Sequence, residues 1–119
     1  MNGAVALMLV STLLTGALAR DVDWTAPAET AARTNPLAAR TDLTAGGKKL
    51  FGQRCAECHG ADARGTDRAP DLTAGDVQEQ SDGALFWKIS SGNTRTGMPS
   101  FSFLPEAQRW QLVLSLRAR

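Results

Sequence analysis

The sequence is poor in the side chains that build metal and catalytic sites. Its 119 residues include one histidine and two cysteines. A structural zinc site needs four ligands, mostly nitrogen or sulfur, so carboxylates would have to complete one here. The formal net charge is only +1, which gives no electrostatic argument for binding nucleic acid. Internal repeats are absent and no segment has a convincing strand pattern. These shortages favour a small all-α protein whose chemistry depends on few side chains.

The N-terminal residues have the pattern of an export signal. Residues 3–19 form an apolar run that ends in Ala17-Leu18-Ala19, the small-x-small pattern that precedes signal-peptide cleavage. We therefore predict a signal peptide over residues 1–19 and a periplasmic, oxidising location for the remainder. The alternative is an uncleaved membrane tether through residues 3–19. About seventeen helical residues would extend roughly 25 Å, slightly less than the ~30 Å hydrocarbon layer.

Residues 20–41 are predicted to be an extended leader or linker. They are rich in alanine, threonine and proline and have no sustained apolar period, as is typical of linkers. Trp24 is the exception. We expect Trp24 to pack on the surface of the domain, with a partner contact as the alternative.

The folded domain is predicted to span residues 42–119 and to begin with a helix. Leu43, Gly47 and Phe51 fall on one face at helical spacing, and the pattern leads directly to Cys55. Gly47 stands where that face should be apolar. A glycine there would let another backbone approach closely, and the alternative is a tolerated weakness of the helix.

Two further helices are expected, separated by irregular loops. Ser81 suits the N-cap of a helix over residues 82–90, and Gly92 suits its end. Pro105 suits the first position of a last helix. Loops over residues 60–75 and 92–104 would bury little apolar surface, so the domain needs a large apolar group at its centre.

Cys55, Cys58 and His59 form the C-x-x-C-H motif used for covalent haem attachment. Two cysteines three positions apart can form thioethers to the two vinyl groups of one porphyrin, and the adjacent histidine is then directed at the iron. One covalent haem c is therefore predicted. The alternative is a disulfide or a thioredoxin-like motif, although no strand precedes the cysteines here.

Met98 is the expected second ligand of the iron. His59 is the only histidine, and the other two methionines lie in the export segment. Met98 is flanked by Gly97 and Pro99 in an irregular loop, where filling a gap in the core is the alternative role. A thioether ligand favours ferrous haem and so raises the reduction potential.

Over residues 42–119 the chain resembles the class I monohaem c-type cytochromes, the bacterial cytochrome c family. Besides the haem-attachment motif and the methionine loop, Gly47 and Phe51 resemble the family's helix-contact residues. Trp110 is similar to its aromatic residue in the closing helix, whereas Ser115 stands where a tyrosine is common. The resemblance implies a cytochrome c-like fold, with a few short helices and long loops wrapped around one covalently bound haem.

The resemblance also implies electron transfer, by a soluble carrier or by the cytochrome subunit of an oxidoreductase complex. Ala69-Pro70-Asp71-Leu72 is similar to the family segment in which a proline carbonyl accepts the free N–H of the iron-binding histidine. The expected cofactor-binding residues are Cys55, Cys58, His59, Met98 and Pro70, with His59 and Met98 on the iron. Redox proteins are the expected partners, and the chain is expected to be monomeric alone or a subunit of a complex.

An enzymatic or sensory iron site is the alternative function. If Met98 dissociated, the open iron could bind a peroxide or a diatomic gas. Peroxidase chemistry normally needs a distal acid-base group, and the sequence has no second histidine to provide one.

Overall fold

The structure is a computed structural model that describes residues 24–119. The predicted signal peptide over residues 1–19 lies outside the described residues. The described chain is helical, and its elements are α1 (Ala28–Ala31), the 3-10 turn η1 (Thr41–Leu43), α2 (Thr44–Arg54), α3 (Ala56–His59), α4 (Gly75–Gln78), α5 (Asp82–Ser91) and α6 (Glu106–Arg117). Within residues 24–119 no helix is long and apolar enough to cross a membrane.

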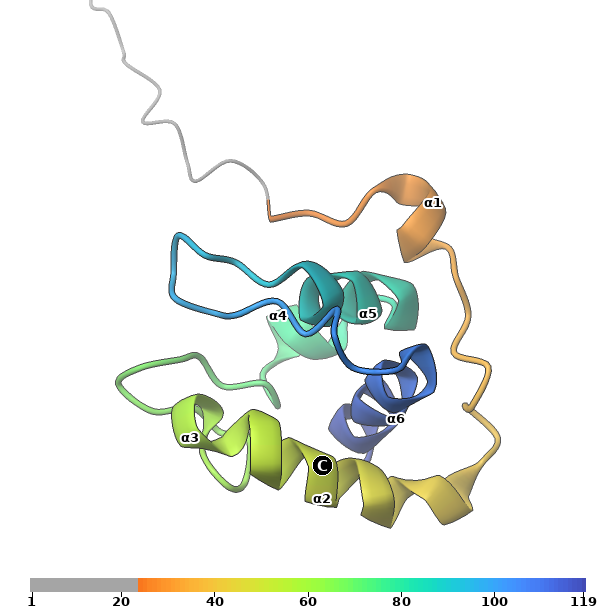
Figure 1. Cartoon of the computed structure of the whole chain (residues 1–119), viewed down its shortest axis with the longest axis horizontal. Coiled ribbons are helices and arrows are strands. Elements are labelled where there is room, and N and C mark those ends of the chain that lie inside the picture. The colour runs from red at the N-terminus through yellow and green to blue at the C-terminus, as the bar shows by residue number, and fades with distance from the viewer. Residues whose placement is uncertain (1–23) are drawn as a thin grey trace, which may run out of the picture.

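Helices α2 and α6 cross in close contact at the base of the molecule (Figure 1). The crossing depends on Gly47, because a Cβ atom there would lie 2.3 Å from the carbonyl oxygen of Gln111 and 3.0 Å from Cβ of Ser115. The predicted close approach of a second backbone at Gly47 is therefore confirmed. Ser115 is fully buried, and its hydroxyl donates to the carbonyl of Leu112 over 2.7 Å. A serine in place of the family's tyrosine leaves the helix contact intact.

The apolar core lies where α5 and α6 face each other. The rings of Phe86 and Trp110 stack with their centroids 3.9 Å apart and their planes 18° apart. Phe51 of α2 and the aliphatic side chains Leu112 and Val113 of α6 are almost completely buried beside them. Burial of these large side chains supplies most of the favourable free energy of folding.

The ends of α5 and α6 follow the predicted start and stop residues. The hydroxyl of Ser81 accepts a hydrogen bond from the backbone N–H of Ala84, as an N-cap does. Gly92 ends α5 with a φ of +63°, which favours glycine. Pro105 directly precedes α6 as its N-cap residue rather than its first helical residue. The one-turn helices α1 and α4 were not predicted.

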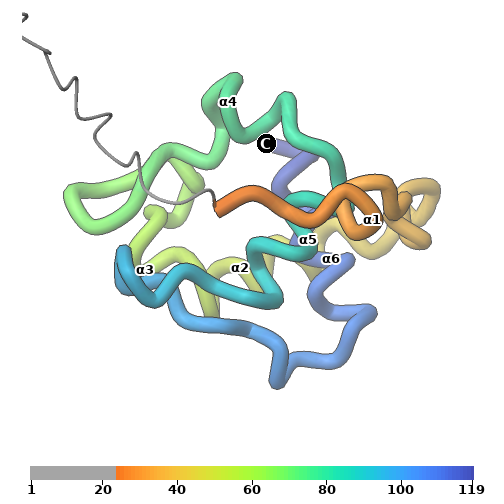
Figure 2. The backbone as a smooth tube through the Cα atoms, turned by 90° about the horizontal axis from the view of Figure 1, so that it is seen from above, coloured from red at the N-terminus to blue at the C-terminus, as the bar shows by residue number. Residues whose placement is uncertain are grey.

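Residues 24–40, called here the N-terminal segment, pack against the domain and do not form the extended leader expected from their composition. Helix α1 lies beside α5 in both views (Figures 1 and 2). A Cβ on Gly83 of α5 would lie 2.1 Å from the carbonyl oxygen of Thr30, so only glycine permits this approach. Asn35 is buried, and its side-chain amide donates to the carbonyl of Trp110 over 3.1 Å. The segment therefore contacts both α5 and α6.

Candidate haem-binding site

The C-x-x-C-H motif lies at the junction of α2 and α3. Cys55 ends α2, with its N–H bonded to the carbonyl of Phe51, and the N–H of His59 bonds to the carbonyl of Cys55. Because residues three positions apart in a helical turn lie on the same face, Cys55 and Cys58 can react with one ligand. No disulfide joins them. Burial, the largest effect, raises the pKa of the Cys55 thiol to about 11, so that this sulfur is neutral near pH 7.

The imidazole of His59 is oriented by the loop that follows it. Its Nδ1 lies 2.9 Å from the carbonyl oxygen of Pro70. A carbonyl oxygen can only accept, so Nδ1 carries the proton and Nε2 keeps a free lone pair for a metal ion. This arrangement is typical of metal-binding histidines.

The loop that carries Pro70 is folded tightly onto the motif. A Cβ on Gly65 would lie 2.7 Å from the backbone nitrogen of Asp71, so the two arms of the loop touch. The carboxylate of Asp71 accepts hydrogen bonds from the N–H and the hydroxyl of Thr73, at 2.7 and 2.6 Å. These two bonds hold the pKa of Asp71 below its usual value, and the bond from the hydroxyl has the larger effect. The loop therefore holds the Pro70 carbonyl in place.

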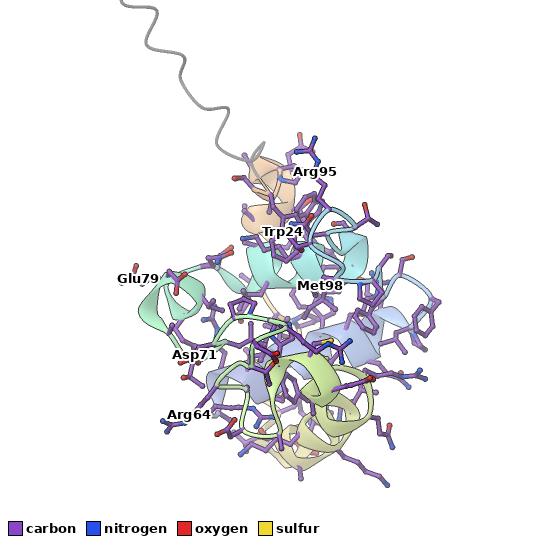
Figure 3. All side chains as sticks on the ribbon, turned by 90° about the vertical axis from the view of Figure 1, so that its left-hand side faces the viewer. Trp24, Arg64, Asp71, Glu79, Arg95 and Met98 are labelled. Atoms are coloured by element: carbon purple, nitrogen blue, oxygen red, sulfur yellow. The ribbon has the colours of Figure 1, made fainter. Side chains whose placement is uncertain are left out.

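Met98 lies in the second loop, residues 92–104. Its backbone forms a two-bond bridge with Asn93: Asn93 N–H donates to Met98 O over 2.9 Å, and Met98 N–H donates to Asn93 O over 3.0 Å. Gly97 makes the intervening turn with a φ of +88°. The Met98 side chain is partly buried and packs at the edge of the core. Figure 3 shows Met98 on the same face of the molecule as Asp71 of the first loop.

The donor atoms of Cys55, Cys58, His59 and Met98 are of the kinds that hold a covalently bound haem. They comprise two thiols, one imidazole nitrogen fixed in the metal-binding tautomer, and one thioether. Leu72 and Val77 are partly exposed apolar side chains that pack on the same core as Met98. A structural zinc site fits less well than a haem, because it needs four ligands. No group of three or more His, Cys, Asp and Glu side chains gathers in residues 24–119.

Comparison with known proteins agrees with the haem-attachment motif. A family model described as "Cytochrome C oxidase, cbb3-type, subunit III" matches residues 42–114, more than half of the chain. The chain belongs to this family of c-type cytochromes. A solved structure, the "KustC0563 c-type cytochrome", is similar with a TM-score of 0.54 and 29% sequence identity, over 60% of this chain and 94% of that one. No curated protein matches the chain.

As a c-type cytochrome, the protein binds haem c covalently and transfers electrons, and Cys55, Cys58 and His59 are the matching attachment motif. Such cytochromes are generally exported. Of the predicted site residues, the structure brings His59 and Pro70 into direct contact, and Met98 lies on the face that carries Asp71, the neighbour of Pro70.

Two residues beside Met98 were not recognised as site residues from the sequence. Asn93 pairs with Met98 across five positions of an irregular loop, a spacing that belongs to no regular element. Trp24 was expected only to pack on the domain surface, and it does: its indole N–H donates to the carbonyl of Gly92 over 2.9 Å. No local pattern indicates this contact, because the two residues are 68 positions apart.

Proposed function

We propose that this cytochrome is a periplasmic electron-transfer protein whose single haem is bound by Cys55 and Cys58, with His59 and Met98 as the two iron ligands. The haem iron, when bound, supplies reversible one-electron chemistry. The observation that carries the proposal is the hydrogen bond from His59 Nδ1 to the Pro70 carbonyl, because it leaves Nε2 free for the iron. Met98 is the only methionine outside the predicted signal peptide.

The side chains of this chain have separate tasks in that function. The Pro70 carbonyl holds the His59 ring in one orientation. Met98 offers a soft sulfur, which favours the reduced metal and raises the reduction potential. If His59 and Met98 both held the iron, substrates would have no access to the metal, and the haem would supply electron transfer only.

We infer that the protein works either as a soluble carrier or as the cytochrome subunit of an oxidoreductase complex. The family description names an oxidase subunit, which supports the second alternative. The N-terminal segment is packed against α5 and α6, so we assign it to the haem domain rather than to a free attachment arm. We retain residues 1–19 as the proposed export signal, with redox proteins as partners.

The test is the substitution Met98→Ala in holoprotein made with a working haem-maturation system. We expect the reduction potential to fall by on the order of 0.1 V, because a strong ferrous-stabilising ligand is lost. Haem staining of a denaturing gel checks that the haem stays attached, since only thioether-bound haem survives the gel. Phe103→Leu is the matched control: Phe103 is 64% exposed in the same loop, so its loss should leave the potential unchanged. A Met98→Ala protein with the parental potential would contradict the assignment.

A further inference from the structure

The peptide unit between Gly92 and Asn93 is held at both of its polar ends. Its carbonyl oxygen, on Gly92, accepts the hydrogen bond from the indole N–H of Trp24 over 2.9 Å. Its N–H, on Asn93, donates to the carbonyl of Met98 over 2.9 Å. Because a peptide unit is planar and stiff, the orientation of one end fixes that of the other. Trp24 is thus two hydrogen bonds away from the backbone of Met98.

Close packing adds to these hydrogen bonds. Gly92 is buried, and a Cβ there would lie 2.5 Å from both the carbonyl carbon and the oxygen of Pro99. The backbone of Pro99, which follows Met98, therefore packs directly against Gly92, whose carbonyl accepts the hydrogen bond from Trp24. Displacement of the Gly92 carbonyl would disturb both chain segments that flank Met98, since packed groups do not shift independently.

Trp24 is itself held by the domain. The ammonium group of Lys88 lies 4.8 Å from the centroid of its ring, within the range of a cation–π contact. The segment that follows Trp24 is fixed along its length: the hydroxyl of Ser81 donates to the carbonyl of Ala31 over 2.6 Å, and Asn35 is buried against Trp110. Figure 3 labels both Trp24 and Met98 on the side of the molecule that faces the viewer.

We propose that Trp24 is a positioning residue for Met98: through the Gly92–Asn93 peptide, the N-terminal segment steadies the loop that presents the methionine sulfur to the iron. This inference rests on the proposed ligation by Met98. It gives the N-terminal segment a task in the redox site, in addition to its packing. Weakening the Trp24 contact should make Met98 leave the iron more often, while the haem stays attached through the cysteines.

Trp24→Phe tests the proposal, because phenylalanine keeps an aromatic ring over Lys88 and removes the indole N–H. The probe is imidazole, which binds ferric holoprotein only when Met98 has left the iron. Loss of one hydrogen bond predicts a rise in imidazole affinity of roughly two- to tenfold. Trp110→Phe is the matched control: it also removes an indole N–H, one that lies 3.4 Å from Glu106 in another part of the fold. We expect it to lower stability without changing imidazole affinity.

Amide hydrogen exchange in the ferrous holoprotein provides a readout that does not depend on what binds the iron. In Trp24→Phe the amides of Asn93 and Met98 should exchange faster than in the parent, whereas amides in α2 should keep the parental rate. Unchanged exchange at Asn93 and Met98 would overturn the proposal. Once Met98→Ala has shown that Met98 binds the iron, an imidazole affinity of Trp24→Phe equal to that of the parent would also overturn the proposal. If Met98→Ala leaves the potential unchanged, the proposed ligation fails by itself, and the exchange result still decides whether Trp24 steadies the loop.

Discussion

Gly47 shows how one missing atom decides the packing of two helices. An added Cβ would lie 2.3 Å from a backbone carbonyl oxygen of α6, and backbone cannot move aside as a flexible side chain can. The sequence indicated this position, because a glycine stood where the helix face should have been apolar.

Gly47→Ala should therefore lower the free energy of unfolding by about 1–3 kcal/mol, through overpacking of the α2–α6 contact. Gly52→Ala is the control in the same helix. A Cβ at Gly52 would meet no atom within 4 Å, so alanine should stabilise the protein by roughly 0.5–1 kcal/mol through its better helix propensity. Guanidinium unfolding of both holoproteins, followed by circular dichroism, measures the difference. Equal stability of the two variants would show that α2 and α6 are not in close contact.

The individual residues of the candidate site were predictable to different degrees. The roles expected for Cys55, Cys58 and His59 follow from a contiguous motif, in which spacing alone carries the chemistry. Met98 could be proposed by elimination. Asn93 and Trp24 could not. Asn93 pairs with Met98 through backbone groups that every residue type possesses, and the indole of Trp24 bonds to a carbonyl 68 positions away.

At the scale of elements, the loop over residues 60–75 is held by polar bonds as well as by burial of Ala63 and Leu72. Asp71 accepts two hydrogen bonds from Thr73, next to the carbonyl that orients His59. The pKa of this carboxyl is lowered in the folded state, with the Thr73 hydroxyl as the largest cause. Stabilisation from the ionised form is therefore fully present above the unfolded pKa, about 4, and is lost as the pH falls through the lower folded pKa.

Asp71→Asn should accordingly unfold more easily than the parent at pH 7, and this difference should shrink below about pH 4. Urea unfolding of the holoprotein at a series of pH values measures the effect. Asp67→Asn, an exposed carboxylate in the same loop, serves as the control and should follow the parent throughout. A stability difference between Asp71→Asn and the parent that does not depend on pH would contradict the role assigned to the ionised carboxylate.

The longer helices were predictable, and the shortest ones were not. Ser81, Gly92 and Pro105 mark the ends of α5 and α6 because capping and helix breaking are local backbone properties. Helices α1 and α4 span four residues each, which is too short for any periodicity to be read. The packing of the N-terminal segment was also missed. It depends on pairs such as Asn35 with Trp110, 75 positions apart.

At the scale of the whole molecule, the candidate site is formed by two irregular loops that are each tied to the helical core. The first loop touches α3 through Pro70 and His59, and the second touches α5 at its base, where Phe101 N–H bonds to the carbonyl of Ile89 over 3.0 Å. The N-terminal segment joins the second loop at one end and α6 at the other. The two loops and the N-terminal segment are thus each bonded to the helical core.

Gly83 is the position at which the N-terminal segment can be lifted from α5 without substituting a residue of the candidate site. A Cβ there would lie 2.1 Å from the carbonyl oxygen of Thr30 and 2.8 Å from that of Arg33, so Gly83→Ala should lift the N-terminal segment from α5. Trypsin should then cleave after Arg33 at least roughly fivefold faster than in the parent, because cleavage follows the population of the opened segment. Gly75→Ala is the control, since its Cβ would meet only a glutamate side-chain oxygen at 3.8 Å. Haem staining should be equal in all three proteins. If trypsin cleaved Gly83→Ala at the parental rate, the packing of the N-terminal segment would not depend on this contact.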